Sequence, residues 1–152
     1  MQLAPRTAIR SNPFKPAPVF SHEEQVAWSK YGRLLGQRPS FTLDPFFHAG
    51  AYYVQEASSM FLEFAFLSIE KSLREEGKAL KVLDLCAAPG GKSTHLASLI
   101  GADDLLISNE ILKSRVQVLR DNLVKWGLLN THVTNLEPAA FGKIQGFFDI
   151  MV

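Results

Sequence analysis

A glycine-rich turn is the part of the sequence with the clearest capacity for chemistry. The run Val82–Thr94 reads VLDLCAAPGGKST, an apolar segment followed by two glycines and the start of a helical pattern. A strand, turn and helix in this order direct backbone N–H groups and the positive end of a helix toward a ligand. Gly90 and Gly91 permit a close approach, because they carry no side chain. The sequence therefore predicts a small-molecule site at this turn.

Spacing excludes two phosphate-binding interpretations of the turn. A P-loop needs a glycine five residues before Gly91, and that position holds Cys86. The dinucleotide fingerprint Gly-x-Gly-x-x-Gly is also absent. S-adenosylmethionine has no phosphate. It needs a binding site for its methionine end and an acid for its ribose, so it remains as the candidate ligand. Glu110 follows Gly90 at about the 20-residue offset expected of a ribose-binding acid, although it could also complement the dipole of the following helix.

Three segments carry a family resemblance. Asp84–Thr94 closely resembles the first motif of the RNA (cytosine-5) methyltransferases of the Sun (Fmu-like) family. His48–Met60 resembles the segment that precedes this motif, and Asn109-Glu110 followed by Arg115 resembles the second motif. The similarity runs from about Thr7 to the last residue, so it covers nearly the whole chain.

The resemblance implies roles for individual residues and a cofactor, S-adenosylmethionine. The family's cofactor loop falls on Cys86, Ala87, Ala88, Pro89, Gly90, Gly91 and Lys92. Its ribose-binding acid falls on Glu110 and its adenine-contacting acid on Glu137, where the family usually has Asp. Glu137 could instead be a solvent-facing turn acid before Pro138, and Lys92 a solvated helix residue. The implied substrate is RNA, with ribosomal RNA favoured over transfer RNA, and no metal is implied.

The catalytic residue implied by the resemblance is a cysteine thiolate that attacks carbon 6 of cytosine so that carbon 5 accepts the methyl group. The family places its cysteines in two loops that would follow Val152. We therefore expect this chain to contain no catalytic residue, to be a piece of a longer protein and to be inactive alone. Cys86, the only cysteine, is expected to be a small side chain beside the ligand rather than a substitute nucleophile.

Alternation of helices and strands predicts an α/β fold around this turn. Apolar runs predict strands at 80–85, 105–108, 132–134 and 148–152, and helical patterns cover 58–76, 93–100 and 111–126. In the first helix, Met60, Phe64 and Leu67 are expected to share the buried face. Strands that alternate with helices pair in parallel. We expect an incomplete Rossmann-like methyltransferase sheet in residues 51–152.

Residues 1–50 form a different segment, rich in proline and basic. They hold six of the eight prolines, which disfavour long helices, and six basic residues against three acidic ones. One short helix is predicted at Ser21–Lys30, with Ser21 and Glu24 as a capping box. This segment could belong to an RNA-binding subdomain, or its basic residues could form an ordinary solvated surface. Its candidate phosphate contacts are Arg6, Arg10, Lys15, Arg33 and Arg38.

Composition limits the remaining choices. The net charge is only +1, the chain is 47% hydrophobic, and a single cysteine makes an internal disulfide impossible. These features predict a folded cytoplasmic protein without a membrane span, whose oligomeric state the sequence leaves open. His48, His95 and His132 lack metal-ligand spacing and are expected on helix surfaces or loops. Tyr52 and Tyr53 could stack on RNA bases or pack under the helix of Phe64, and packing is favoured.

Two other function classes remain open. The chain could be a non-catalytic module that binds S-adenosylmethionine or RNA, or part of a methyltransferase for small molecules or proteins, because fold alone does not fix the substrate.

Overall fold

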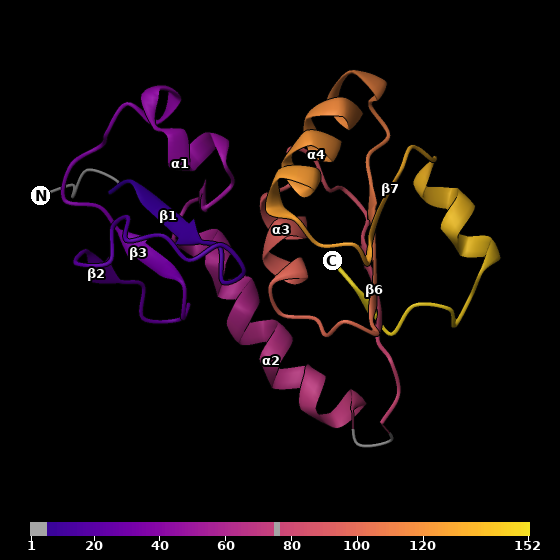
Figure 1. Cartoon of the computed structure of the whole chain (residues 1–152). Helices are drawn as coiled ribbons and strands as arrows, with labels where there is room; N and C mark the ends of the chain where they lie inside the picture. The colour runs from indigo at the N-terminus through magenta and orange to yellow at the C-terminus, as the bar shows by residue number, and fades with distance from the viewer. Residues whose placement is uncertain (1–5, 75–76) are drawn as a thin grey trace, which may run out of the picture.

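A computed structural model describes residues 6–74 and 77–152, and these residues form two four-stranded sheets (Figure 1). The N-terminal sheet is antiparallel and has the order β2-β3-β1-β4. Its strands are β1 (Ala8–Ser11), β2 (Glu24–Gln25), β3 (Gly32–Leu34) and β4 (Tyr52–Val54). We call this sheet, together with the short helix that follows β3, the N-terminal unit. Because it includes β4, the unit continues beyond residue 50. The division of the chain into domains at residues 1–50 and 51–152 stays a prediction.

An aromatic cluster holds the N-terminal sheet together. A 3₁₀ turn (Phe41–Leu43) and the short helix α1 (Pro45–His48) cross the sheet and place Phe41 and Phe47 against Tyr52. Asp44 begins α1 by accepting a hydrogen bond from Phe46 N, and its other oxygen accepts one from Tyr52 Oη at 2.7 Å. Tyr52 is 3% exposed. Its predicted packing role is confirmed, but it packs in this cluster and not under the helix of Phe64.

The second sheet is parallel, with the order β7-β6-β5-β8. Its strands are β5 (Lys81–Asp84), β6 (Leu105–Asn109), β7 (Thr131–Thr134) and β8 (Ile150–Met151). The connecting helices are α3 (Gly91–Ala97), between β5 and β6, and α4 (Lys113–Trp126), between β6 and β7. A 3₁₀ helix, η3 (Pro138–Lys143), precedes β8. This is the predicted α/β arrangement, and the predicted strands and helices from residue 80 onward form with shifts of a few residues.

Helices lie between the two sheets. In Figure 1, α3 and α4 cover the face of the parallel sheet that is turned toward the N-terminal sheet, and η3 lies on the opposite face. Helix α2 (Leu62–Leu73), preceded by a 3₁₀ turn (Ser58–Phe61), connects the two sheets. Phe66 of α2 enters the core of the parallel sheet with Val82, Leu96 and Trp126. The strand order reverses at β5, because β6 and β8 flank it, and ligands of open α/β sheets bind at such a reversal.

The N-terminal unit also caps the end of α4. Asn12 Nδ2 donates to Trp126 O at 2.9 Å, and Lys15 Nζ donates to Lys125 O at 2.6 Å, so the last turn of α4 has partners for its free carbonyls. Gly50 lies against the same turn with φ +73°, and a Cβ there would be 2.2 Å from Lys125 O. Only glycine fits this approach.

The helix predicted at Ser21–Lys30 is wrong. These residues form β2 and turns, with Glu24 opposite Leu34 and Gln25 opposite Arg33 of β3. Val26 is 1% exposed and packs with Ala8 and Met60. Strand pairing and burial of Val26 outweigh the local capping signal, because tertiary contacts override weak helix preferences.

The buried face predicted for the helix at 58–76 is also wrong in part. Met60 is fully buried, but Phe64 and Leu67 are 57% and 48% exposed, whereas Glu63 and Phe66 are buried. Met60 lies in a 3₁₀ turn, which has fewer residues per turn than an α-helix. Residues at α-helical spacing from Met60 therefore do not share its buried side in α2. The end of the prediction, residues 75 and 76, lies outside the described residues. Across residues 6–74 and 77–152, none of the helices combines the length and apolarity needed to cross a membrane.

Candidate cofactor site

The glycine-rich turn lies at the carboxyl end of β5. Ala87 N donates to Asn109 O of β6 at 2.8 Å, and Gly90 N closes the turn on Ala87 O at 2.8 Å. Gly90 has φ +114°, and an added Cβ would lie 3.4 Å from both Leu119 Cδ1 and Asn122 Cβ. The left-handed conformation explains why a glycine precedes α3, whereas an added Cβ would make only ordinary van der Waals contact with α4. The turn is therefore held by β6 on one side and by α4 on the other.

The residues of the predicted cofactor loop have different exposures. Ala87 and Ala88 are 3% and 9% exposed and pack with Leu119 and Leu123 of α4. Cys86 and Pro89 are exposed, and the peptide bond between Ala88 and Pro89 is cis. The two alanines thus have a packing role beneath the turn. Cys86 is exposed, and its expected place beside a ligand stays a prediction.

Asp84, at the end of β5, is a site residue that the sequence analysis missed. Its side chain is fully buried, and Oδ2 accepts a hydrogen bond from Ser93 Oγ at 2.7 Å. Oδ1 has no hydrogen-bond partner among the described residues and lies 3.7 Å from Lys92 Nζ. Burial raises the pKa of this carboxyl above its usual value, although Ser93 and Lys92 oppose the rise. A single acid at the end of an apolar strand, directly before a glycine-rich turn, is the signal that could have identified it.

Lys92 was considered either as a residue of the cofactor loop or as a solvated helix residue. Its side chain is 41% exposed, so it is partly solvated, and its ammonium also forms an ion pair with Asp84.

Glu110 follows β6 and lies beside the turn. It is 4% exposed, and its Oε1 accepts a hydrogen bond from Leu112 N at 2.9 Å. Its Oε2 lies 3.5 Å from Arg115 Nη1, while Arg115 Nη2 donates to Ala88 O at 2.6 Å. Arg115 therefore connects the acid to the turn across two strand ends. Arg115 was predicted only as part of the second motif, and its contact with the turn was not predicted, because that contact depends on how α4 packs.

Glu137 lies at the end of the neighbouring strand, β7. Its backbone precedes η3 and its side chain is exposed. The preceding Leu136 is fixed to β6, because Asn109 Oδ1 accepts from Leu136 N and Asn109 Nδ2 donates to Leu136 O, both at 3.0 Å. The structure therefore brings the turn, Glu110 and Glu137 to the ends of three adjacent strands.

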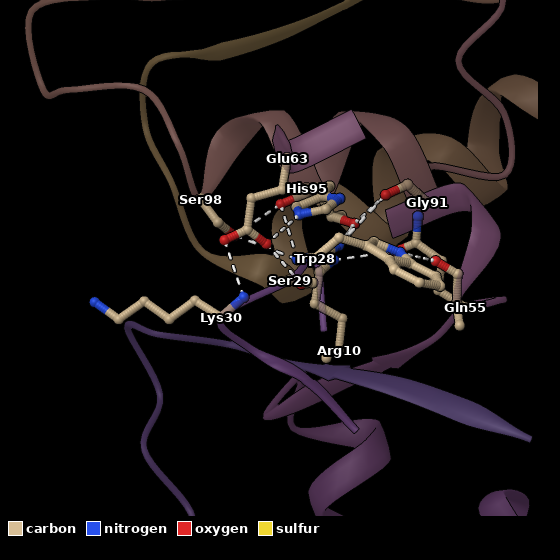
Figure 2. Close-up of polar contacts among 12 residues, drawn as sticks. Arg10, Trp28, Ser29, Lys30, Gln55, Glu63, Gly91, His95 and Ser98 are labelled. Carbon is tan, nitrogen blue, oxygen red and sulfur yellow. Dashed lines mark hydrogen bonds and ion pairs between the residues drawn. The ribbon is translucent and has the colours of Figure 1, made fainter. Parts of the chain in front are cut away.

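A buried polar network lies behind the turn and joins it to the N-terminal sheet (Figure 2). Arg10 of β1 is 0% exposed, and its guanidinium stacks on Trp126 at 4.5 Å from the ring centre. It donates to Gln55 Oε1 at 3.0 Å, Thr94 Oγ1 at 2.7 Å and Gly91 O at 3.3 Å. Burial lowers the pKa of Arg10 to about 9. The prediction that Arg10 contacts phosphates is wrong, because solvent cannot reach it.

His95 belongs to the same region. It is 0% exposed, and its Nε2 lies 3.2 Å from Glu63 Oε2 (Figure 2). Glu63 also accepts hydrogen bonds from Ser29 Oγ at 2.6 Å and Lys30 N at 3.0 Å. The prediction of a surface histidine is wrong for His95, since α3 is covered by α2 and the N-terminal unit. His48 ends α1 and is exposed as predicted, whereas His132 is exposed but lies in strand β7 and not on a helix or loop. No group of three or more His, Cys, Asp or Glu side chains within 6–74 and 77–152 could hold a metal ion.

Comparison with protein families gives two matches that together cover most of the chain. A family model described as 16S rRNA methyltransferase RsmB/F matches residues 72–152. A second, described as the N-terminal domain of 16S rRNA methyltransferase RsmF, matches residues 1–57.

Curated relatives and solved structures agree with these matches. Ribosomal RNA small subunit methyltransferase F of Shewanella piezotolerans is 40% identical over 94 residues, which are 62% of this chain and 19% of that protein. The Salmonella arizonae protein of the same name is 35% identical over 105 residues, 68% of this chain and 21% of that protein. This chain thus spans about a fifth of the length of these relatives.

Among solved structures, a methyltransferase homolog protein from Pyrococcus horikoshii superimposes with a TM-score of 0.77 at 28% identity, covering 98% of this chain and 50% of that one. The crystal structure of NSun6 from the same organism with SFG gives a TM-score of 0.58 at 23% identity, over 76% of this chain and 28% of that one, and supports the fold alone.

Proposed function

The chain belongs to the RsmB/F family of 16S rRNA methyltransferases, and from this we propose that it is the cofactor-binding part of an enzyme that methylates carbon 5 of cytosine in ribosomal RNA. S-adenosylmethionine is the cofactor of methyltransferases of this family. The observation that carries the proposal is the nearly buried Glu110 carboxylate, at the end of β6 and joined through Arg115 to the glycine-rich turn at the end of β5.

The residues of the turn fit the methionine end of the cofactor. Among the described residues no donor lies within hydrogen-bond distance of the buried Asp84 Oδ1, and Lys92 Nζ is 3.7 Å away, so this oxygen can accept from the α-ammonium of S-adenosylmethionine. The cofactor's carboxylate suits the backbone N–H groups that begin α3 after Gly90. We propose that Cys86–Lys92 and Asp84 hold this end of the cofactor. When bound, the cofactor supplies the methyl group.

The two acids at the next strand ends fit the remainder of the cofactor. A carboxylate can accept hydrogen bonds from both ribose hydroxyls, and Glu110 has its orientation fixed by Leu112 N and Arg115. Glu137 is exposed and one residue away from the anchored Leu136, so its side chain is free to accept from the adenine amino group. We assign Glu110 to the ribose and Glu137 to the adenine.

Calorimetric titration with S-adenosylmethionine tests this assignment. Replacing Glu110 by alanine removes a charged hydrogen-bond acceptor, and the expected loss is about 1.5–3 kcal/mol of binding free energy. Glu56→Ala, at an exposed acid of the N-terminal unit, is the control. Equal affinity in the Glu110 variant, the control and the unmodified protein would refute the assignment of Glu110 to the ribose. The proposed site would then lose its main support.

The proposed substrate is RNA, with ribosomal RNA favoured by the names of the matched family and relatives. We further propose that this chain alone transfers no methyl group, since Cys86 belongs to the cofactor turn and is not placed to attack a base beyond the cofactor. Incorporation of tritiated methyl groups into unmodified ribosomal RNA measures this directly. Cofactor-dependent incorporation by the chain alone, abolished by Cys86→Ser, contradicts the proposal.

A further inference from the structure

A small hollow between the N-terminal unit and α4 has the composition of a base-binding pocket. Its volume is about 150 Å³. Its lining residues come from α1 and β4 on one side and from the second half of α4 on the other. Its lining consists of Phe47, Gly50, Tyr52, Tyr53, Val54, Asn122, Lys125 and Trp126. Half of these residues are aromatic. Tyr52 and Trp126 are almost fully buried, so the half-buried rings of Phe47 and Tyr53 provide the surface on which a planar aromatic ligand can stack.

Polar groups at this hollow have unused hydrogen-bonding capacity. Tyr53, Asn122 and Lys125 are half-buried, so they are accessible from solvent. Asn122 Nδ2 donates to Pro89 O at 2.7 Å, but over the described parts of the chain neither Asn122 Oδ1 nor Tyr53 Oη has a hydrogen-bond partner. Burial raises the pKa of Tyr53, so its hydroxyl stays protonated and can donate. Lys125 adds a positive charge, with its Nζ 4.7 Å from the centre of the Phe47 ring.

Size selects the class of ligand. An apolar cavity of about 150 Å³ accommodates one benzene-sized ring. A pyrimidine is one such ring, with carbonyl oxygens that can accept from Lys125 and Tyr53 and polar hydrogens that can be donated to Asn122 Oδ1. A purine has two fused rings and would extend out of a hollow of this size. Single-stranded RNA offers unstacked bases of this kind, and proteins bind them by stacking on aromatic side chains.

The hollow is next to the cofactor turn but separate from it. Asn122 connects the two, because its amide lines the hollow and donates to Pro89 O of the turn. Tyr53 also lies near the turn, 3.5 Å from the position of a Cβ on Gly91. We propose that this hollow binds an unstacked pyrimidine of the RNA, distinct from the cytosine that is methylated, and so fixes the RNA relative to the cofactor. This inference rests on the proposed RNA substrate.

Titration of the ¹⁵N-labelled protein with cytidine tests the pocket without a phosphate. The expected result is saturable chemical-shift change at Tyr53, Val54 and Asn122, with weaker changes there for inosine and none for ribose 5-phosphate. Shifts caused equally by ribose 5-phosphate would assign the contact to Lys125 and a phosphate, and would overturn the base pocket. The absence of cytidine-dependent shifts at these residues overturns it as well.

Matched variants separate the pocket from general effects on the protein. Tyr53→Leu is expected to weaken cytidine binding by about tenfold, which is the effect of losing one base-aromatic stack. Phe64→Leu removes an exposed aromatic ring of α2 outside the hollow and should leave cytidine binding unchanged. Tyr53→Phe keeps the ring and retains most of the affinity if stacking dominates. Equal affinity in Tyr53→Leu and Phe64→Leu contradicts the proposal.

The same samples distinguish failure of this inference from failure of the proposed function. S-adenosylmethionine should shift the resonances of the turn and of Glu110 independently of cytidine. If the cofactor binds and cytidine does not, the pocket is refuted and the cofactor assignment stands. If cytidine binds and the cofactor does not, the cofactor assignment fails while the pocket remains.

Discussion

Arg10 Nη2 donates to Thr94 Oγ1 at 2.7 Å, and the same hydroxyl donates to Gly90 O at 2.8 Å. These two hydrogen bonds connect β1 of the N-terminal sheet to the turn that is proposed to hold the cofactor. The acceptors around Arg10 are neutral groups, and Glu63 acts on it only through the electrostatic field. Its charge is therefore held by amide, hydroxyl and carbonyl dipoles and by the face of Trp126.

Replacing Arg10 tests this connection. Arg10→Met should lower the free energy of unfolding by about 2–4 kcal/mol, because buried acceptors lose their donor. Cofactor affinity should also fall by at least about fivefold, as expected for a coupled site, when it is measured well below the unfolding temperature. Arg10→Lys keeps the charge but has fewer hydrogen-bond donors. Its stability and cofactor affinity should therefore lie between those of Arg10→Met and the unmodified protein. Arg38→Met, at an exposed arginine of the same unit, is the control. Reduced stability with unchanged cofactor affinity would limit Arg10 to a structural role.

Glu63 and His95 should make the protein less stable in acid. Burial lowers the pKa of His95, so below pH 6.5 the unfolded chain takes up a proton that the folded protein does not, and stability falls as the pH falls. Burial alone would raise the pKa of Glu63, but donors from His95, Ser29 and Lys30 outweigh it and hold the pKa at about 2. Glu63 therefore adds a second loss between pH 4.5 and 2.

Urea unfolding at a series of pH values measures both contributions. His95→Gln should remove the component that begins near pH 6.5, and Glu63→Gln the component that begins near pH 4.5. Glu56→Gln, at an exposed acid whose side chain has no hydrogen bond among the described residues, should change neither. An unchanged pH profile in both buried variants contradicts the assignment.

Gly90→Ala tests the geometry of the turn. The left-handed conformation at φ +114° costs a residue with a side chain about 1–2 kcal/mol. We expect lower stability together with weaker binding of S-adenosylmethionine. Gly142→Ala is a matched control, since its added Cβ meets no atom within 4 Å. Thermal unfolding and calorimetry on the two variants give the comparison, and equal behaviour would show that the turn tolerates a side chain.

RNA binding by the N-terminal unit should depend on its exposed arginines. Arg6 and Arg38 line one open hollow of about 520 Å³, and Arg6 is held by Glu24 and Leu34 O. Replacing both by glutamine should reduce the slope of log affinity against log salt by roughly one unit for each phosphate that is no longer neutralised. Filter binding over a salt series measures the slope. Lys71→Gln with Lys143→Gln removes equal charge outside the unit, and the same reduction in that variant would indicate only a nonspecific charge effect.

Local patterns were sufficient for much of the α/β part of the chain. The apolar strands, the glycine-rich turn and the position of Glu110 follow from short runs of sequence, and the resemblance to RNA methyltransferases that they carry is confirmed by the family match. Asp84 and Arg115 lie in the segments that carry the resemblance, but their individual roles were not predicted, because those roles depend on which strand ends and helices are neighbours.

The N-terminal segment was harder to predict for the same reason. Arg10 is a surface residue by type, and its burial depends on acceptors at Gln55 and on α3, more than 40 residues away in the sequence. His95 is covered by α2 and by Ser29, whose hydroxyl contacts the same Glu63 carboxylate as His95 Nε2 does. Such burial results from tertiary contacts, which local periodicity does not encode.

The cap that Asn12 and Lys15 provide for the last carbonyls of α4 has a consequence for recombination between relatives. A hybrid protein that joins this N-terminal unit to another relative's methyltransferase part inherits a foreign α4 end, which must still accept these two donors and pass within reach of Gly50. Exchange of the two parts is therefore tolerated only between chains whose α4 termini match in length and backbone position. The N-terminal unit and α4 are expected to be inherited together, although they lie far apart along the chain.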